Sequence, residues 1–116
     1  MECIRQADYI FLEWYTSRLT GTTVERLQEV YQKEICLVDR REIEQTPQEM
    51  LDLAKTARVV LLSGGDPMVS TTHIDLRMRA ESAGIETRII HGASIATAIS
   101  GVTGLQNYRF GKSCSV

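Results

Sequence analysis

The sequence predicts an α/β domain with three layers, in which helices cover both faces of a doubly wound, mostly parallel sheet. Short apolar segments alternate along the 116 residues with segments of helical periodicity, and this alternation is typical of strands joined by crossover helices. Two glycine-containing turns, at Gly64-Gly65 and at Gly92, each stand between an expected strand and an expected helix. Both turns should lie at one edge of the sheet, which is where ligands bind in folds of this class.

Composition places the chain among ordinary globular domains. A hydrophobic content of 43% and a net charge of −2 give no indication of a nucleic-acid partner. No apolar run approaches the roughly 18 residues of a membrane span, and nothing resembles a secretory signal. Cys3, Cys36 and Cys114 are odd in number and far apart, so neither a disulfide framework nor a zinc site is expected. We expect reduced thiols, with Cys36 in the core.

The chain begins with a short helical stretch and a strand. Residues 1–7 have a helical composition but are too few to form a stable helix alone. The apolar segment that follows predicts a strand over residues 9–13. It leads into Glu13-Trp14-Tyr15-Thr16-Ser17, which is rich in hydrogen-bonding groups. From residue types alone, this segment is a loop with two packed aromatic rings.

A helix and a second strand come next. Thr22 and Glu25 fit a capping box, and apolar residues at helical spacing predict an amphipathic helix over residues 23–32. A buried strand is expected over residues 34–38. The charged segment 39–42 after it is typical of a solvated surface.

The third expected strand has a helix in front of it. Thr46 fits an N-cap, Pro47 the first helical position and Glu49 the acidic partner of a capping box. The apolar face of this helix is made by Met50, Leu51, Leu53, Ala54 and Ala57. The apolar run that follows predicts a strand over residues 58–62, buried on both faces.

A glycine loop that displays one carboxylate follows this third strand. Gly64-Gly65 permit a sharp turn and close approach of a ligand to the backbone. Pro67 pushes Asp66 towards an extended conformation. The polar cluster 70–73 then opens a helix.

The next helix and the fourth strand follow from periodicity. We expect Ile74 and Met78 on the inner face of the helix, and Gly84 as the left-handed residue at its C-terminal end. The apolar residues beyond Gly84 predict a fourth strand over residues 86–90.

A second strand-to-helix loop, His91-Gly92-Ala93-Ser94, completes the pattern. Ser94 is a good N-cap, and its helix is rich in small residues that would let it lie close to a sheet or a partner. Gly104 should end this helix. Residues 109–116 are expected to cross out of the domain.

The common signatures of nucleotide binding and serine catalysis do not match the two loops. No Lys-Ser or Lys-Thr follows Gly64-Gly65-Asp66-Pro67, and neither Gly-x-Gly-x-x-Gly nor Gly-x-Ser-x-Gly occurs. His73 and His91, each beside a loop, are candidate site groups, although a histidine that fills a turn is commoner. The residues alone therefore indicate a small-ligand site on an α/β domain.

Five blocks of the chain resemble the archaeal diphthine synthases, within the tetrapyrrole-methylase-like S-adenosylmethionine-dependent methyltransferases. The blocks are Glu13–Ser17 (the family usually has Glu-x-Tyr-Thr-Ser), Asp39-Arg40, Gly65-Asp66-Pro67 with Thr71-Thr72-His73, His91–Ile95 and Gly104–Gly111. Gly-Asp-Pro recurs across the wider group, whereas the Tyr-Thr-Ser and Thr-Thr-His blocks make the resemblance specific. The resemblance covers essentially the whole chain.

The resemblance implies that residues 1–111 are an incomplete N-terminal cofactor-binding domain that lacks its first strand. Family members begin with that strand and a glycine-rich loop before the position of Met1, and they continue into a second α/β domain. Residues 112–116 would begin the crossover to it. We therefore expect residues 1–116 alone to have negligible methyltransferase activity and to self-associate, through exposed sheet edges or the family's dimer surface.

The resemblance also implies an activity. Family members are cytoplasmic homodimers that use S-adenosyl-L-methionine and act on translation elongation factor 2 in diphthamide biosynthesis. They methylate the amine of a 3-amino-3-carboxypropyl side chain on a modified histidine, and the expected archaeal product is a trimethylated amine. No membrane and no direct nucleic-acid partner is implied. The cofactor supplies the chemistry, and the protein supplies position and electrostatics.

Carried over position by position, the family's cofactor contacts fall on Asp66 and Val69 in the first loop and on Ser94 and Ile95 in the second. Val69 and Ile95 suit apolar walls, and backbone N–H groups near Ser94 suit cofactor acceptors. Transfer consumes the sulfonium charge, so Asp66 suits the amino-acid or ribose end of the cofactor better than the sulfur. A purely structural alternative makes Asp66 a turn residue, Ser94 a cap, and Val69 and Ile95 core. No catalytic residue and no metal ligand is assigned.

Two rival functions stay open. The chain could belong to a methyltransferase for a corrinoid or porphyrin ring. It could also be a non-catalytic piece that only packs or dimerises.

Overall fold

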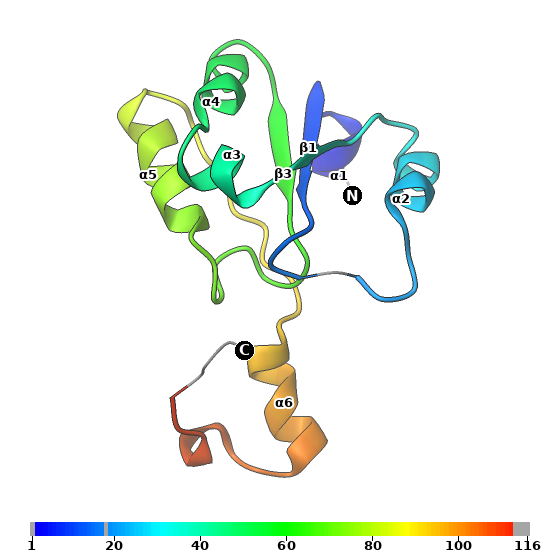
Figure 1. Cartoon of the computed structure of the whole chain (residues 1–116), viewed down its shortest axis with the longest axis vertical. Helices are drawn as coiled ribbons and strands as arrows, with labels where there is room; N and C mark the ends of the chain where they lie inside the picture. The colour runs from blue at the N-terminus through cyan, green and yellow to red at the C-terminus, as the bar shows by residue number, and fades with distance from the viewer. Residues whose placement is uncertain (1, 18, 113–116) are drawn as a thin grey trace.

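The computed structural model describes residues 2–17 and 19–112 and shows a parallel sheet with a C-terminal arm extending from it (Figure 1). Strand β1 (Tyr9–Glu13) lies in the middle, between β2 (Cys36–Val38) and β3 (Val59–Leu62). Both pairings are parallel, and Phe11 is the register partner of Cys36 on one side and of Leu61 on the other. The first three predicted strands are confirmed, with β2 and β3 slightly shorter than expected.

Helices cover both faces of the sheet, so the predicted three-layer α/β class is confirmed. On one face lie α1 (Glu2–Arg5) and α2 (Val24–Tyr31); on the other lie α3 (Arg40–Glu44), α4 (Gln48–Ala54) and α5 (His73–Ser82). Alternation along β1 sends Ile10 and Leu12 to the first face and Phe11 to the second. Trp14 and Tyr15 continue the alternation into the two clusters, as expected for two packed rings.

The predicted fourth strand is wrong. Residues 86–90 form no strand in the structure, and their side chains alternate between half-buried and exposed, with Ile90 57% exposed. An alternating apolar pattern describes one covered face, but a strand also needs a neighbour for its backbone hydrogen bonds. The hydrogen-bonded sheet of the described residues contains β2, β1 and β3 and does not include this segment.

Three helix starts differ from expectation. Two are shifted by one residue, and one lies in a segment that was not expected to be helical. The N-cap of α2 is Thr23, whose Oγ1 accepts a hydrogen bond from Arg26 N at 3.2 Å, rather than Thr22. Residues 39–42, expected as a solvated surface, contain the capping box of α3, in which Asp39 and Glu42 accept each other's backbone N–H. Helix α4 begins after Pro47, which itself occupies the cap position without a side-chain bond.

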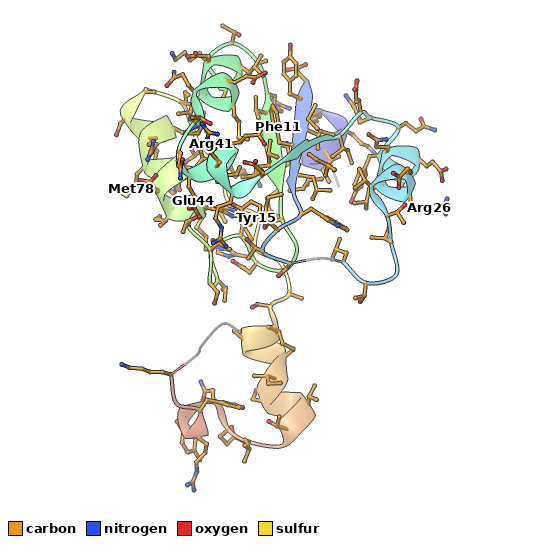
Figure 2. The ribbon with its side chains drawn as sticks, viewed as in Figure 1. Phe11, Tyr15, Arg26, Arg41, Glu44 and Met78 are labelled. Carbon is orange, nitrogen blue, oxygen red and sulfur yellow. The ribbon has the colours of Figure 1, made fainter. Side chains whose placement is uncertain are left out.

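The inner face of α5 is not the predicted one. Ile74 and Met78 are 50% and 60% exposed, and Figure 2 shows Met78 on the outer side of the helix. His73 and Ala80 are buried, and Leu76 packs on the core. Both sets of residues have helical spacing, and packing against the sheet decides which set is buried. Gly84 does take the predicted left-handed conformation, with φ +75°.

The arm consists of α6 (Ile95–Thr103) and a short 3-10 helix, η1 (Asn107–Arg109). Ser94 caps α6 as predicted, accepting from Ala96 N at 3.2 Å, and Gly104 ends it with φ +70°. Helix α6 itself contains no buried residue, and its small side chains are exposed except for that of Ser100, which is half-buried. The expected crossing segment, residues 109–116, is described only as far as residue 112.

The cysteines correct one further expectation. Cys3 is half-buried and Cys36 is exposed, so the predicted core position of Cys36 is wrong. Cys36 begins the short edge strand β2, in which only Val38 is buried. Cys114 lies outside the described residues.

Candidate functional site

Three loops meet at the carboxyl end of the sheet: residues 13–17 after β1, residues 63–73 after β3, and residues 91–95 before α6. Figure 1 shows the loops after β1 and β3 at the lower end of the sheet. A Cβ on Gly64 would lie 2.8 Å from the backbone oxygen of Ser17, and a Cβ on Gly92 only 2.3 Å from that of Gly65. Both distances are too short for real side chains, so glycine permits direct backbone contact between these loops.

Asp66 joins the second and third loops. Its side chain is 8% exposed. Oδ1 accepts a hydrogen bond from Met68 N at 2.8 Å, and Oδ2 accepts one from Gly92 N at 3.3 Å and lies 2.8 Å from His91 Nδ1. The Met68 N–H, and after it His91, hold the pKa of the Asp66 carboxyl below its usual value, although burial opposes them. Asp66 is therefore an anion at neutral pH, and its contacts crosslink two loops.

The other three residues that sequence reasoning selected lie on the same two loops. Val69 is half-buried, and its N–H donates to the backbone oxygen of Asp66 at 3.2 Å. Ser94 is 9% exposed and Ile95 70% exposed, at the start of α6. The structure thus connects Asp66 and Val69 with Ser94 and Ile95 through the Asp66–Gly92 contact. Whether the four contact a cofactor stays a prediction.

His73 fills a turn, as the commoner interpretation of a single histidine expects. It is 4% exposed, and its Nδ1 lies 3.1 Å from the backbone oxygen of Pro67, which also accepts from Thr71 Oγ1. Because a carbonyl can only accept, Nδ1 carries the proton. His91 has the different role of contacting Asp66.

Glu13 is a site residue that sequence reasoning did not single out. Its side chain is 0% exposed, at the end of the central strand. Oε2 accepts from Thr16 N at 3.1 Å, whereas Oε1 has no partner within the described residues. A signal was present in the sequence, because Glu13 is an acidic residue in phase with Phe11 on an otherwise apolar strand.

The residue types of the three loops suit an organic ligand. Within residues 2–17 and 19–112, no three His, Cys, Asp or Glu side chains are grouped so that they could hold a metal ion. None of the described helices has the length and apolar character needed to cross a membrane. The loops offer two buried carboxylates, those of Asp66 and Glu13, together with exposed backbone at Gly65 and Gly92, apolar side chains and a helix N-terminus.

Comparisons with known proteins agree with one another. A family model described as Tetrapyrrole (Corrin/Porphyrin) Methylases matches residues 1–116. The diphthine synthases of Methanosphaerula palustris and Methanospirillum hungatei are 61% and 58% identical over all of this chain and 46% of their own length. A crystal structure of diphthine synthase superposes with a TM-score of 0.90 at 46% identity, over 95% of this chain and 43% of the other. The chain spans about half the length of the curated relatives that it matches.

Proposed function

Because the chain belongs to the tetrapyrrole (corrin/porphyrin) methylase family, we propose that it forms part of a diphthine synthase that uses S-adenosyl-L-methionine. The proposed acceptor is the amine of the 3-amino-3-carboxypropyl side chain on the modified histidine of translation elongation factor 2. The observation that carries this proposal is 61% identity over the whole chain to a protein of that name. The three joined loops at the carboxyl edge of the sheet support it, because ligands of open α/β sheets bind there.

The residues of the second and third loops fit the proposed cofactor. Val69 and the exposed Ile95 offer apolar surface, and the N-terminus of α6 offers backbone N–H groups to polar acceptors. Asp66 is already bonded to both loops, so we assign it chiefly to holding them in register. When bound, S-adenosyl-L-methionine supplies the methyl group. This chain's part is to orient the ligand and exclude water.

The finer assignments are proposals of the same kind. We place residues 1–111 in the N-terminal cofactor-binding domain of a cytoplasmic homodimer, and residues 112–116 at the start of the crossover to a second domain. The match of this chain to 46% of its relatives' length supports a further part of similar size in those proteins.

The function is tested by following radiolabelled methyl transfer with the complete gene product. We expect transfer to the unmethylated elongation-factor intermediate and none to a corrinoid or porphyrin ring. Transfer to the ring alone would replace the proposal by the rival methyltransferase. Calorimetry of residues 1–116 with S-adenosylhomocysteine tests the second rival, because binding near the affinity of a complete enzyme would argue against a non-catalytic piece.

Replacing Asp66 separates a binding role from a structural one. Asp66→Ala should weaken cofactor binding by about tenfold or more, since a charged hydrogen-bonding group that links two loops is lost. The fold should persist because the carboxylate lies outside the sheet. Calorimetry with S-adenosylhomocysteine and thermal unfolding measure the two effects. The matched control is Asp52→Ala on the exposed side of α4. Unchanged affinity with a large loss of stability would make Asp66 purely structural.

A further inference from the structure

The buried carboxyl group of Glu13 lacks a partner for one of its oxygens. Its side chain is completely covered, yet Thr16 N is its one hydrogen-bond donor, and no ion pair of the described residues includes it. Covering a polar oxygen without giving it a hydrogen-bond partner is unfavourable. Groups of this kind persist chiefly where function requires them. The unpartnered Oε1 could therefore accept a hydrogen bond from a cationic or N–H-bearing ligand.

Tyr15 belongs to the same face of the chain as Glu13. Alternation after β1 places both on the side of Phe11, and the Tyr15 ring packs against that cluster. Its hydroxyl is buried and has no partner among the residues described. Burial first, and then the negative charges of Glu13 and Glu44, raise the pKa of this hydroxyl. Arg40 and Thr16 act in the opposite direction, but the pKa is raised on balance, so the hydroxyl stays protonated at neutral pH.

Arg40 lies against the same ring and is positive. Its guanidinium carbon is 5.3 Å from the centroid of the Tyr15 ring. Its Nε is 3.7 Å from Glu44 Oε1, a long contact for a side chain that is 68% exposed. Thr72 Oγ1 donates to the same Glu44 oxygen at 2.8 Å and so links this group to the loop after β3. Figure 2 shows Tyr15 and Glu44 at the lower side of α3.

We propose that Glu13, Tyr15 and Arg40 bind the amino-acid end of the acceptor side chain, an inference that rests on the proposed function. The acceptor carries an amine and a carboxylate on one carbon. Glu13 Oε1 accepts from the amine beside the Tyr15 ring, and the Arg40 guanidinium binds the carboxylate in the fork geometry that suits it. The cluster is a positioning site that holds the amine of the acceptor side chain in place for methyl transfer.

Two features favour the acceptor over the cofactor as the ligand of this cluster. The four proposed cofactor residues lie on or beside the loops that Asp66 joins, whereas Tyr15 follows β1 and Arg40 lies on α3, which adjoins the loop after β3 through the Thr72–Glu44 hydrogen bond. Ser17 contacts Gly64, so the Glu13–Tyr15–Arg40 cluster and the proposed cofactor residues are neighbours. Methyl transfer requires the donor and the acceptor to lie side by side. Because Glu13 is fully covered, loop 13–17 must open for the acceptor to reach it.

The test compares acceptor and cofactor affinity in variants of the complete gene product. Glu13→Gln and Arg40→Gln should each raise KM for the unmethylated elongation-factor intermediate at least tenfold. The Kd of S-adenosylhomocysteine should stay within twofold of wild type. The matched control is Glu25→Gln, which removes an exposed carboxylate from α2 and should change neither constant. Arg40→Gln changes a side chain that is 68% exposed and keeps the inference testable should Glu13→Gln fail to fold.

Thermal unfolding separates this role from a structural one. Glu13→Gln should unfold close to the wild-type temperature, because the amide keeps the shape of the side chain and an oxygen that can accept from Thr16 N. Unchanged acceptor KM, or a cofactor Kd that rises as much as KM, would overturn the inference while leaving the proposed function standing. An inactive wild-type protein would overturn both.

Discussion

Two regions of the molecule contain helices with similar N-caps but differ in how far those helices are buried. The body, residues 2–91, and the arm, residues 95–112, each contain a helix capped by a hydroxyl side chain, through Thr23 in α2 and Ser94 in α6. Neither helix contains a fully buried residue. Val24, Leu27 and Tyr31 of α2 are nevertheless half-buried against the core beside β1. Helix α6 is the more apolar of the two, yet most of its residues are exposed. Caps and propensity therefore suffice to shape a helix, but burial depends on a partner surface.

The body contains the parallel sheet, whereas the described residues of the arm contain no strand. Four of the five residues of β1 are buried, because helices cover both of its faces and a strand lies on each side. In the arm, Val102 and Tyr108 are 78% and 77% exposed. Stability should consequently respond strongly to changes in the body and weakly to the same changes in the arm.

The largest expected effect comes from the centre of the body. Leu12→Ala should lower the free energy of unfolding by about 2–5 kcal/mol, because Leu12 is 2% exposed and its removal leaves a cavity. The corresponding truncation in the arm, Val102→Ala, should change it by less than about 0.5 kcal/mol. Urea denaturation of both variants measures the contrast. Equal losses would show that the arm is packed in solution.

A pair of glycine substitutions should differ in sign. Gly92→Ala forces a Cβ towards the backbone of Gly65 and should destabilise by about 1–3 kcal/mol, with weaker cofactor binding. Gly101→Ala in α6 meets no atom within 4 Å and should stabilise the helix by up to about 1 kcal/mol. Denaturation and calorimetry measure both. A neutral Gly92→Ala would mean that the two loops separate readily.

The smallest effect is a dependence on pH. The raised pKa of Tyr15 means that the folded protein retains its proton after the unfolded chain has lost it. Stability should therefore fall as pH rises above about 10, the usual tyrosine pKa. Tyr15→Phe should remove this part of the decline, measured by urea denaturation between pH 8 and pH 11. The control is Tyr108→Phe, and a profile unchanged by Tyr15→Phe would contradict the assignment.

Much of the fold was accessible from the sequence because it depends on neighbours along the chain. Three strands, the cap at Ser94 and the left-handed glycines at Gly84 and Gly104 were predicted correctly. The fourth strand and the inner face of α5 were not. Periodicity states which residues can share a face, but the position of the sheet decides which stripe is covered and whether an extended segment finds a hydrogen-bonding neighbour.

The site divides in the same way. The sequence alone placed a glycine loop before each of two helices, and the resemblance to the family selected Asp66, Val69, Ser94 and Ile95 on or beside those loops. Only the tertiary structure decided that Asp66 reaches Gly92 across 26 positions of the chain, and that Glu13 is buried with one oxygen unpartnered. Hydrogen bonds and burial between distant segments arise from the packing of the loops against one another, for which local residue patterns carry no distance information.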